Sequence, residues 1–186
     1  MWIPSLTYNR GGLGHFGVLW AKALGAEVYV VSHSPSKKED ALSLGAKDFI
    51  NTREKDWAKP WKFTFDLILN CADATDKFNL AEYFSTLKVN GTFHMVGFPD
   101  NPLPKLMAQD FAPNGCFLGA SHIGNRPEML AMLELASKQN IKGWVETIDI
   151  SEQGCKEAVE RVYKNDNVRF RLTLRSEEHT SELQSP

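Results

Sequence analysis

Two segments of this sequence have the residue types and the spacing of a ligand-binding site. The first is rich in glycine, and the second, about twenty residues later, is basic and rich in hydroxyl groups. Residues 9–14 fit the pattern G-x-G-x-x-G, except that Asn9 takes the place of the first glycine. Asparagine tolerates a positive φ better than most residues. Glycines let the backbone approach a diphosphate closely, and the helix that follows directs its free N–H groups at the phosphates. We therefore predict a diphosphate-binding loop of Gly11, Gly12, Leu13 and Gly14.

The second segment follows a β-branched run, residues 27–31, and carries no carboxylate where that run ends. Folds that bind NAD place Asp or Glu there to hold the ribose hydroxyls, and such a carboxylate would repel a 2′-phosphate. Ser32, His33 and Lys37 occupy this region instead, and hydroxyl and ammonium groups can bind a phosphate through charge-assisted hydrogen bonds. The structural alternative is that Ser34 caps a helix and that the lysine is only solvated. Taken with the glycine loop, the segment favours NADP(H) as the cofactor.

The other histidines and the cysteines indicate neither a catalytic nor a metal site. The histidines lie on different predicted elements, without a second His or Cys at metal-ligand spacing. Cys71, Cys116 and Cys155 are far apart and form no CxxC pair, so neither a zinc knuckle nor a disulfide framework is predicted. This use of cysteine is typical of the reduced cytoplasm.

Apolar periodicity predicts alternating helices and strands after the glycine loop. The predicted helices span residues 13–24, 34–44, 79–87, 106–111, 127–139 and 152–164, and the predicted strands span 27–31, 48–51, 65–71, 92–97, 116–120, 144–148 and 168–174. Most of these strands are apolar on both faces, as in a parallel sheet covered by helices on both sides. The sequence therefore predicts an α/β fold of the Rossmann type, a doubly wound parallel sheet. Residues 1–10 are expected to be an aberrant N-terminus that replaces the first strand, because they contain a proline and few β-branched residues.

Composition excludes several classes of partner, and the C-terminal end needs separate treatment. Apolar residues make up 42% of the chain, enough for a core, but no apolar run approaches the roughly 18 residues of a membrane span. Residues 175–186 match the translation of a widely used DNA-sequencing adapter, and we interpret them as adapter read-through, with a genuine disordered tail as the alternative. Without them the chain has equal numbers of basic and acidic side chains. Neither nucleic acid nor an anionic membrane is therefore expected as a partner.

With these residues in hand, the chain resembles the cofactor-binding half of the zinc-dependent medium-chain alcohol dehydrogenases, a family of oxidoreductases. The likeness is to the NADP-preferring branch that includes cinnamyl alcohol dehydrogenases, in a form typical of fungi. It rests on residues 11–15, 31–42, 44–46, 91–97, 119–124 and 167–172. The resemblance implies an NADP-binding Rossmann domain over residues 11–140 and a C-terminal remnant of the catalytic domain over residues 141–174.

The resemblance also implies roles for individual residues. The glycine loop matches the family's diphosphate loop, and Ser32, His33 and Lys37 match the positions that hold the 2′-phosphate. The segments beside the nicotinamide are matched by Val96, Gly97, Ser121, His122 and Ile123, and a basic residue near the diphosphate is matched by Arg169. The family pairs its cofactor domains as homodimers, which would use the strand near Phe117–Ala120.

In this family the zinc ions and their ligands lie before the glycine loop. The resemblance therefore implies a truncated NADP(H)-dependent alcohol dehydrogenase that binds the cofactor, holds no zinc and has no catalytic residue of its own. The full-length parent would use zinc and interconvert a small aldehyde and a primary alcohol. The alternatives are a zinc-free quinone or enoyl reductase of the same superfamily, or a non-enzymatic nucleotide-binding module.

Overall fold

The computed structural model describes residues 4–8, 12–72, 79–164 and 171–176. The chain divides into two compact units, Met1–Lys142 and Gly143–Pro186. The domain boundary predicted from the sequence, after residue 140, lies two residues before this division. Two predicted site residues, Gly11 and Arg169, lie outside the described residues.

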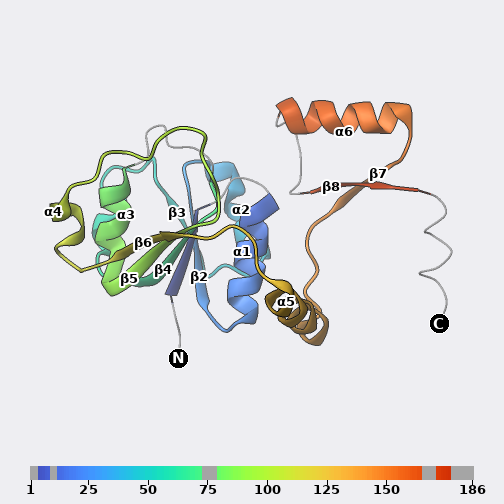
Figure 1. Cartoon of the computed structure of the whole chain (residues 1–186). Coiled ribbons are helices and arrows are strands. Elements are labelled where there is room, and N and C mark those ends of the chain that lie inside the picture. Colours follow the sequence, from blue (N-terminus) through green and yellow to red (C-terminus); the bar gives the residue numbers. More distant parts are fainter. Residues whose placement is uncertain (1–3, 9–11, 73–78, 165–170, 177–186) are drawn as a thin grey trace. The chain divides into compact units, whose positions relative to one another are not determined.

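A six-stranded sheet with flanking helices forms the first unit (Figure 1). Its strands are β1 Pro4–Tyr8, β2 Glu27–Ser32, β3 Asp48–Asn51, β4 Phe65–Asn70, β5 Leu87–Met95 and β6 Phe117–Ala120. Its helices are α1 Gly12–Ala23, α2 Lys38–Ser43, α3 Leu80–Thr86, α4 Ala108–Phe111 and α5 Arg126–Gln139, with 3-10 turns η1 Pro35–Lys37 and η2 Lys59–Trp61. The strand order is β3-β2-β1-β4-β5-β6, and every neighbouring pair is parallel. This order confirms the predicted doubly wound parallel sheet.

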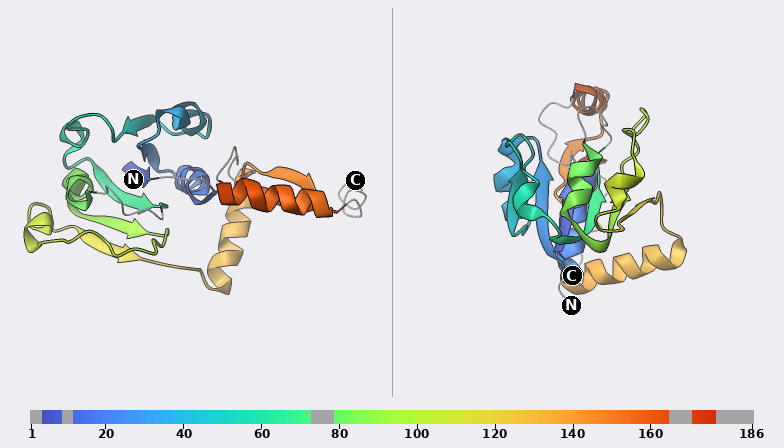
Figure 2. Two further views of the ribbon diagram at one scale, coloured as in Figure 1. Left: turned by 90° about the horizontal axis from the view of Figure 1, so that it is seen from above. Right: turned by 90° about the vertical axis from the view of Figure 1, so that its left-hand side faces the viewer.

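The helices cover both faces of this sheet. In Figures 1 and 2, α1 and α2 lie on one side of the strands and α3 lies on the other. This arrangement follows from right-handed crossovers, because the chain moves outward from β1 in one direction and outward from β4 in the opposite direction. The sheet is therefore buried on both faces where the helices lie, as its apolar strands require.

The first strand is present at the centre of the sheet, although the sequence predicts an aberrant segment in its place. Pro4–Tyr8 pairs with β2 on one side and with β4 on the other, so that Ser5 lies opposite both Val28 and Leu67. A proline is tolerated at the first residue of a strand, and the rest of the ladder consists of backbone groups that any residue supplies. Pairing on both sides thus outweighs the proline and the scarcity of β-branched residues in this segment.

The core lies largely between the sheet and α3 and is rich in aromatic residues. Phe65, Phe84 and Phe93 are all fully buried. The rings of Phe84 and Phe93 meet edge to face with centroids 5.7 Å apart, a favourable geometry for two aromatic rings. Asn114, also buried, donates from Nδ2 to the carbonyl oxygens of Phe84 and Leu87, at 2.7 and 3.0 Å. These contacts fix β5, and with it the residues that follow β5.

Two helices end where the sequence predicts, each at a glycine, and one helix begins later than predicted. Gly25 and Gly45 end α1 and α2 with φ of +84° and +98°, a conformation that glycine adopts without strain. Ser34, however, makes no cap to α2. Its Oγ lies 3.1 Å from the Oγ of Ser36, and the chain first forms η1 before α2 begins at Lys38. A proline directly after Ser34 fixes φ for this tighter turn, and the alternative reading of Ser34 as a helix cap is wrong.

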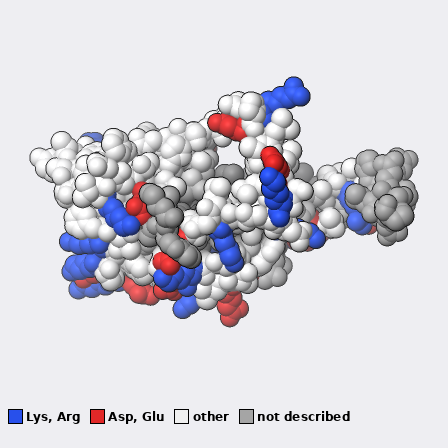
Figure 3. Space-filling view, turned by 90° about the horizontal axis from the view of Figure 1, so that it is seen from below, with Lys and Arg blue, Asp and Glu red and all other residues white. Residues whose placement is uncertain are grey.

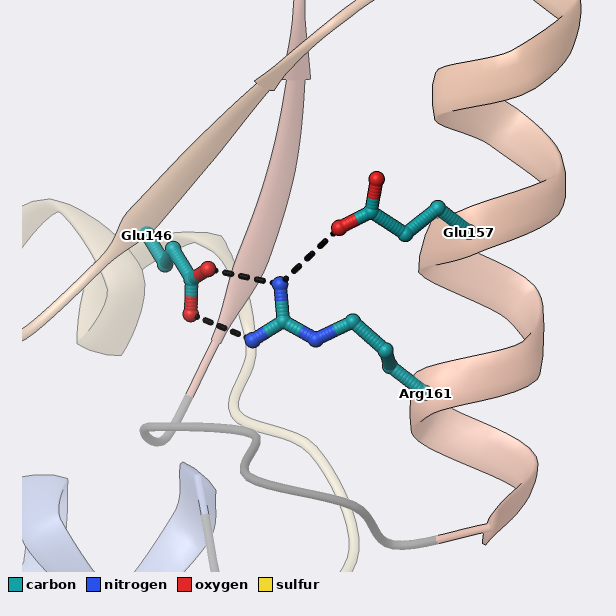
Figure 4. A network of polar contacts seen from close by, with 3 residues as sticks. All are labelled: Glu146, Glu157 and Arg161. Atoms are coloured by element: carbon teal, nitrogen blue, oxygen red, sulfur yellow. Dashed lines mark hydrogen bonds and ion pairs between the residues drawn. The ribbon is translucent and has the colours of Figure 1, made fainter.

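The second unit contains helix α6 (Glu152–Lys164) between two short parallel strands, β7 (Glu146–Asp149) and β8 (Leu172–Arg175). Arg161 donates from both terminal nitrogens to the carboxylate of Glu146, at 2.6 and 2.8 Å, and also approaches Glu157 (Figure 4). The hydrogen bond from Arg161 lowers the pKa of Glu146. Arg175, which the sequence assigns to the foreign tail, pairs with Asp149 at the end of β8. The ion pair between Arg161 and Glu146 joins α6 to β7 within this unit.

Candidate functional site

The described site residues follow the carboxyl ends of neighbouring strands. Tyr8, the last residue of β1, lies opposite Asn70 of β4, which lies opposite Met95 of β5. Met95 in turn lies opposite Ala120, the last residue of β6. Since the strands are parallel and in register, the segments after them lie side by side along one edge, here called the carboxyl edge. Between β1 and β4 the direction of winding reverses, and open α/β sheets bind ligands at such a point.

Helix α1 begins at Gly12, directly after the part of the glycine loop outside the described residues. Gly14, Gly17 and Val18 are buried on the face that packs against β1 and β2, because the small glycines let the helix approach the sheet closely. Leu13 is 45% exposed. The amino end of a twelve-residue helix, with its free N–H groups and partial positive charge, is thereby held at the carboxyl edge.

The end of β2 combines a buried hydroxyl with two half-buried basic side chains. Ser32 is fully buried, and its Oγ accepts a hydrogen bond from the backbone N–H of Ser34 at 3.2 Å. Its carbonyl oxygen accepts from the N–H of Thr52 at 3.1 Å, which ties the end of β2 to the end of β3. His33 and Lys37 follow and are half-buried. The hydroxyl of Ser32 thus orders the turn that presents these two basic side chains.

Residues 32–37, which form this turn, include no Asp or Glu. Glu27, at the opposite end of β2, forms an ion pair with Lys47 at 2.8 Å, and hydrogen bonds from Lys47 and Tyr29 lower its pKa. The next carboxylates along the chain, Glu39 and Asp40, belong to the first turn of α2, where they favour the helix. The position that would select against a 2′-phosphate therefore carries no acid.

Between β4 and β5 the carboxyl edge is packed so closely that one position excludes any side chain. The N–H groups of Val96 and Gly97 both donate to the carbonyl oxygen of Asn70, at 2.9 and 3.1 Å. A Cβ on Gly97 would lie 2.3 Å from the carbonyl oxygen of Ala72. The Asn70 amide closes the turn through bonds to the backbone of Ala72, at 3.2 and 3.3 Å. Gly97 is therefore required by this close approach of two backbone segments.

The segment after β6 is attached to β5 by backbone and side-chain contacts. Ser121 donates its N–H to the carbonyl oxygen of Met95 at 3.0 Å, and its Oγ lies 2.9 Å from Nε2 of His94. The ring of His122 meets Phe98 edge to face, with centroids 5.2 Å apart. Ile123 is 83% exposed. The structure thus brings Val96 and Gly97 together with Ser121 and His122, while the side chain of Ile123 points to solvent.

Sequence reasoning missed two of the residues that build this edge. Asn70 ends a buried strand, where an amide is unexpected among apolar residues, and that position was its signal. His94 carries no such signal, because nothing in the sequence shows that β5 and β6 are neighbours in register. Both residues shape backbone segments rather than offering an obvious catalytic group.

The described residues form no cluster of metal-ligating side chains, and the charges on one face of the molecule are of both signs. Basic and acidic side chains are interspersed on the face seen in Figure 3. In the described part of the chain, no group of three or more His, Cys, Asp or Glu side chains is placed to hold a metal ion. All three cysteines are free, and burial raises the pKa of the Cys71 thiol to about 12. No helix among the described residues is long and apolar enough to cross a membrane.

Comparison with known proteins agrees with this geometry. The family model described as zinc-binding dehydrogenase matches residues 12–138, more than half of the chain. The chain belongs to the zinc-binding dehydrogenase family. This confirms the resemblance that the sequence motifs indicate. The match begins at α1 and runs to the last turn of α5, so it covers the described parts of the carboxyl edge after β1.

Two relatives and one solved structure similar to this chain carry NADP in their names. NADP-dependent alcohol dehydrogenase 6 of Saccharomyces cerevisiae is 38% identical over 88% of this chain and 45% of the relative. NADP-dependent alcohol dehydrogenase C of Mycobacterium bovis is 36% identical over 88% of this chain and 46% of the relative. A cinnamyl alcohol dehydrogenase from Sorghum bicolor superposes with a TM-score of 0.82 at 29% identity, over 99% of this chain and 50% of that structure. A structure of CAD from Helicobacter pylori complexed with NADP(H) superposes with a TM-score of 0.75 at 26% identity, over 96% of this chain and 49% of that structure. The chain spans about half the length of the relatives it matches.

Proposed function

We propose that this chain binds NADP(H) along the carboxyl edge of its six-stranded sheet. The observation that carries the proposal is the turn after β2, where a buried serine orders a segment with two basic side chains and none of residues 32–37 is acidic. An acid at this position selects NAD, and its replacement by hydroxyl and basic groups favours a 2′-phosphate. The NADP-dependent relatives support the same choice of cofactor.

The residues present fit the two ends of this cofactor. The diphosphate would lie at the amino end of α1, on Gly12, Leu13 and Gly14 together with Gly11. The 2′-phosphate would meet His33 and Lys37, with Ser32 holding their turn from below. Arg169 as a further diphosphate contact stays a prediction, since it lies outside the described residues.

The nicotinamide would lie along the segments after β5 and β6. The N–H groups of Val96 and Gly97 are already bonded to Asn70, so these residues would offer the carboxamide their carbonyl oxygens. Ser121, His122 and Ile123 would supply the facing backbone. When bound, NADP(H) supplies the hydride, while the chain holds and orients it.

We further propose that the longer protein interconverts an aldehyde and an alcohol. The relatives named as NADP-dependent alcohol dehydrogenases support this reaction class. Zinc in the parent protein and pairing of two copies through β6 are proposals that rest on the resemblance alone, and a cytoplasmic location is a proposal that rests on the use of cysteine. No contact among the described residues favours a quinone or enoyl reductase, or a non-enzymatic module, over this reading.

The proposal is tested by titrating the chain with NADPH and with NADH, following nicotinamide fluorescence. Lys37→Glu should weaken NADPH binding by at least about tenfold and leave NADH binding within about twofold, since one charge-assisted bond is lost and repulsion is added. Lys62→Glu is the matched control, because this exposed lysine precedes β4 at the opposite edge of the sheet. Equal affinity of the unmodified chain for both cofactors would refute the assignment, as would an equal loss of both in Lys37→Glu.

A further inference from the structure

His94 lies on the face of β5 that turns away from the core. Its neighbours Phe93 and Met95 are buried in the cluster beneath α3, and side chains alternate between faces along a strand. His94 is accordingly half-buried, and it lies opposite Gly119 of β6. A Cβ on Gly119 would lie 3.4 Å from Nδ1 of His94, so the imidazole extends sideways over β6. The ring therefore reaches toward the segment that follows β6.

The imidazole ends on the hydroxyl of Ser121, with 2.9 Å between Nε2 and Oγ. Ser121 is also held by its backbone, whose N–H donates to Met95 at 3.0 Å. A serine hydroxyl otherwise rotates among three staggered positions, and a hydrogen bond between it and the imidazole selects one of them. His94 and Met95, two consecutive residues of β5, thus fix both the main chain and the side chain of the first residue after β6.

We infer that His94 is a positioning residue, which acts through Ser121 to hold the nicotinamide-binding segment in its binding conformation. The inference rests on the proposed NADP(H) site and adds to it a residue that does not itself face the cofactor. The effect of His94 on binding should be confined to the nicotinamide end of the cofactor. The residues proposed to bind the 2′-phosphate follow β2, which is separated from β5 by β1 and β4. Loss of the His94–Ser121 hydrogen bond should therefore weaken the binding of NADPH but not the binding of a ligand that lacks the nicotinamide.

Binding of NADPH and of adenosine 2′,5′-bisphosphate to the whole chain, measured by calorimetry, separates the two ends. His94→Leu should lower the affinity for NADPH by about three- to tenfold, the range expected for one net hydrogen bond, and leave the bisphosphate unchanged. His94→Gln should restore most of the affinity, because its side-chain amide, which can donate or accept, can take the place of Nε2. Thr92→Val, on the same strand two residues away, is the matched control for changes to this face.

Ser121→Ala should reproduce the effect of His94→Leu, and the double variant should show little additional loss, since both remove one shared contact. Unequal single effects that simply add in the double variant would overturn the inference, as would a His94→Leu chain with an unchanged ratio of the two affinities. If the unmodified chain binds neither ligand, the proposed function fails and this inference fails with it. If it binds both and the variants follow neither pattern, only the inference fails.

Discussion

Replacing Gly97 by alanine is the sharpest test of how the carboxyl edge is built. The added Cβ would lie 2.3 Å from the carbonyl oxygen of Ala72, 2.7 Å from its carbonyl carbon and 2.9 Å from the carbonyl carbon of Cys71. All three are backbone atoms, so no side chain can rotate away. Non-bonded carbon atoms normally lie about 3.5–4.0 Å apart, and the two segments would have to separate by roughly 1 Å.

That separation has a calculable cost. Overpacking of this kind costs about 1–3 kcal/mol, and stretching the bond from Gly97 to Asn70 adds about 1 kcal/mol. We therefore expect the free energy of unfolding of the first unit to fall by about 2–4 kcal/mol, which lowers its Tm by roughly 6–15 °C. Urea unfolding followed by far-UV circular dichroism measures the change in free energy, and a thermal scan gives the Tm.

Gly119→Ala is the control within the same sheet. Its Cβ would meet the ring of His94 at 3.4 and 3.8 Å, an ordinary contact, so a change within about 0.5 kcal/mol is expected. If Gly97→Ala changes the free energy of unfolding by no more than about 0.5 kcal/mol, the close approach of the segments after β4 and β5 does not exist in solution. Equal large losses in both variants would show that alanine is poorly tolerated anywhere along β5 and β6, and the local explanation would fail.

Three further predictions concern buried and paired groups. Asn114→Ala should destabilise the first unit by about 2–4 kcal/mol in urea unfolding, because two buried carbonyl oxygens lose their donor; an effect below about 1 kcal/mol would contradict it. Because Arg161 lowers the pKa of Glu146 in the folded state, the stability from this pair is present above the unfolded pKa and lost as pH falls through the lowered one. Thermal scans at a series of pH values from neutral to acid should therefore show a steeper fall of Tm in the unmodified chain than in Glu146→Gln. Parallel plots of Tm against pH would refute the role of the pair. The Cys71 thiol, whose pKa burial raises to about 12, should resist a thiol reagent at pH 8 until urea is added, while the partly exposed Cys155 reacts in the native chain; native labelling of Cys71 at the rate of Cys155 would contradict its burial.

Much of this fold follows from local patterns in the sequence. The β-branched run at residues 27–31, the apolar run at 65–71 and the glycines at 25 and 45 each predict an element or its end, and the structure agrees within a residue or two. These signals are local because propensity and turn geometry act over a few residues. The glycine loop and the end of β2 could be connected for the same reason, since their separation along the chain is characteristic of one structural unit.

The rest depends on which strands become neighbours. β1 forms although its segment contains a proline and few β-branched residues, because both sides of it are occupied by partners. The requirement for glycine at position 97 arises from Ala72, and the role of His94 arises from Ser121, a residue 27 positions further along the chain. Ser34 shows the opposite error, since a good capping residue followed by proline enters a 3-10 turn instead. Each of these outcomes is decided by tertiary contacts that no window of the sequence contains.

The place of β1 also has a consequence for how the first unit folds. β2 and β3 are consecutive in the chain, as are β4, β5 and β6, so each group could assemble from nearby segments. Among the described strands, the hydrogen-bonded ladder passes from one group to the other only through Pro4–Tyr8. Five residues thus couple two half-sheets into one cooperative transition, and a chain lacking them should melt in two steps rather than one.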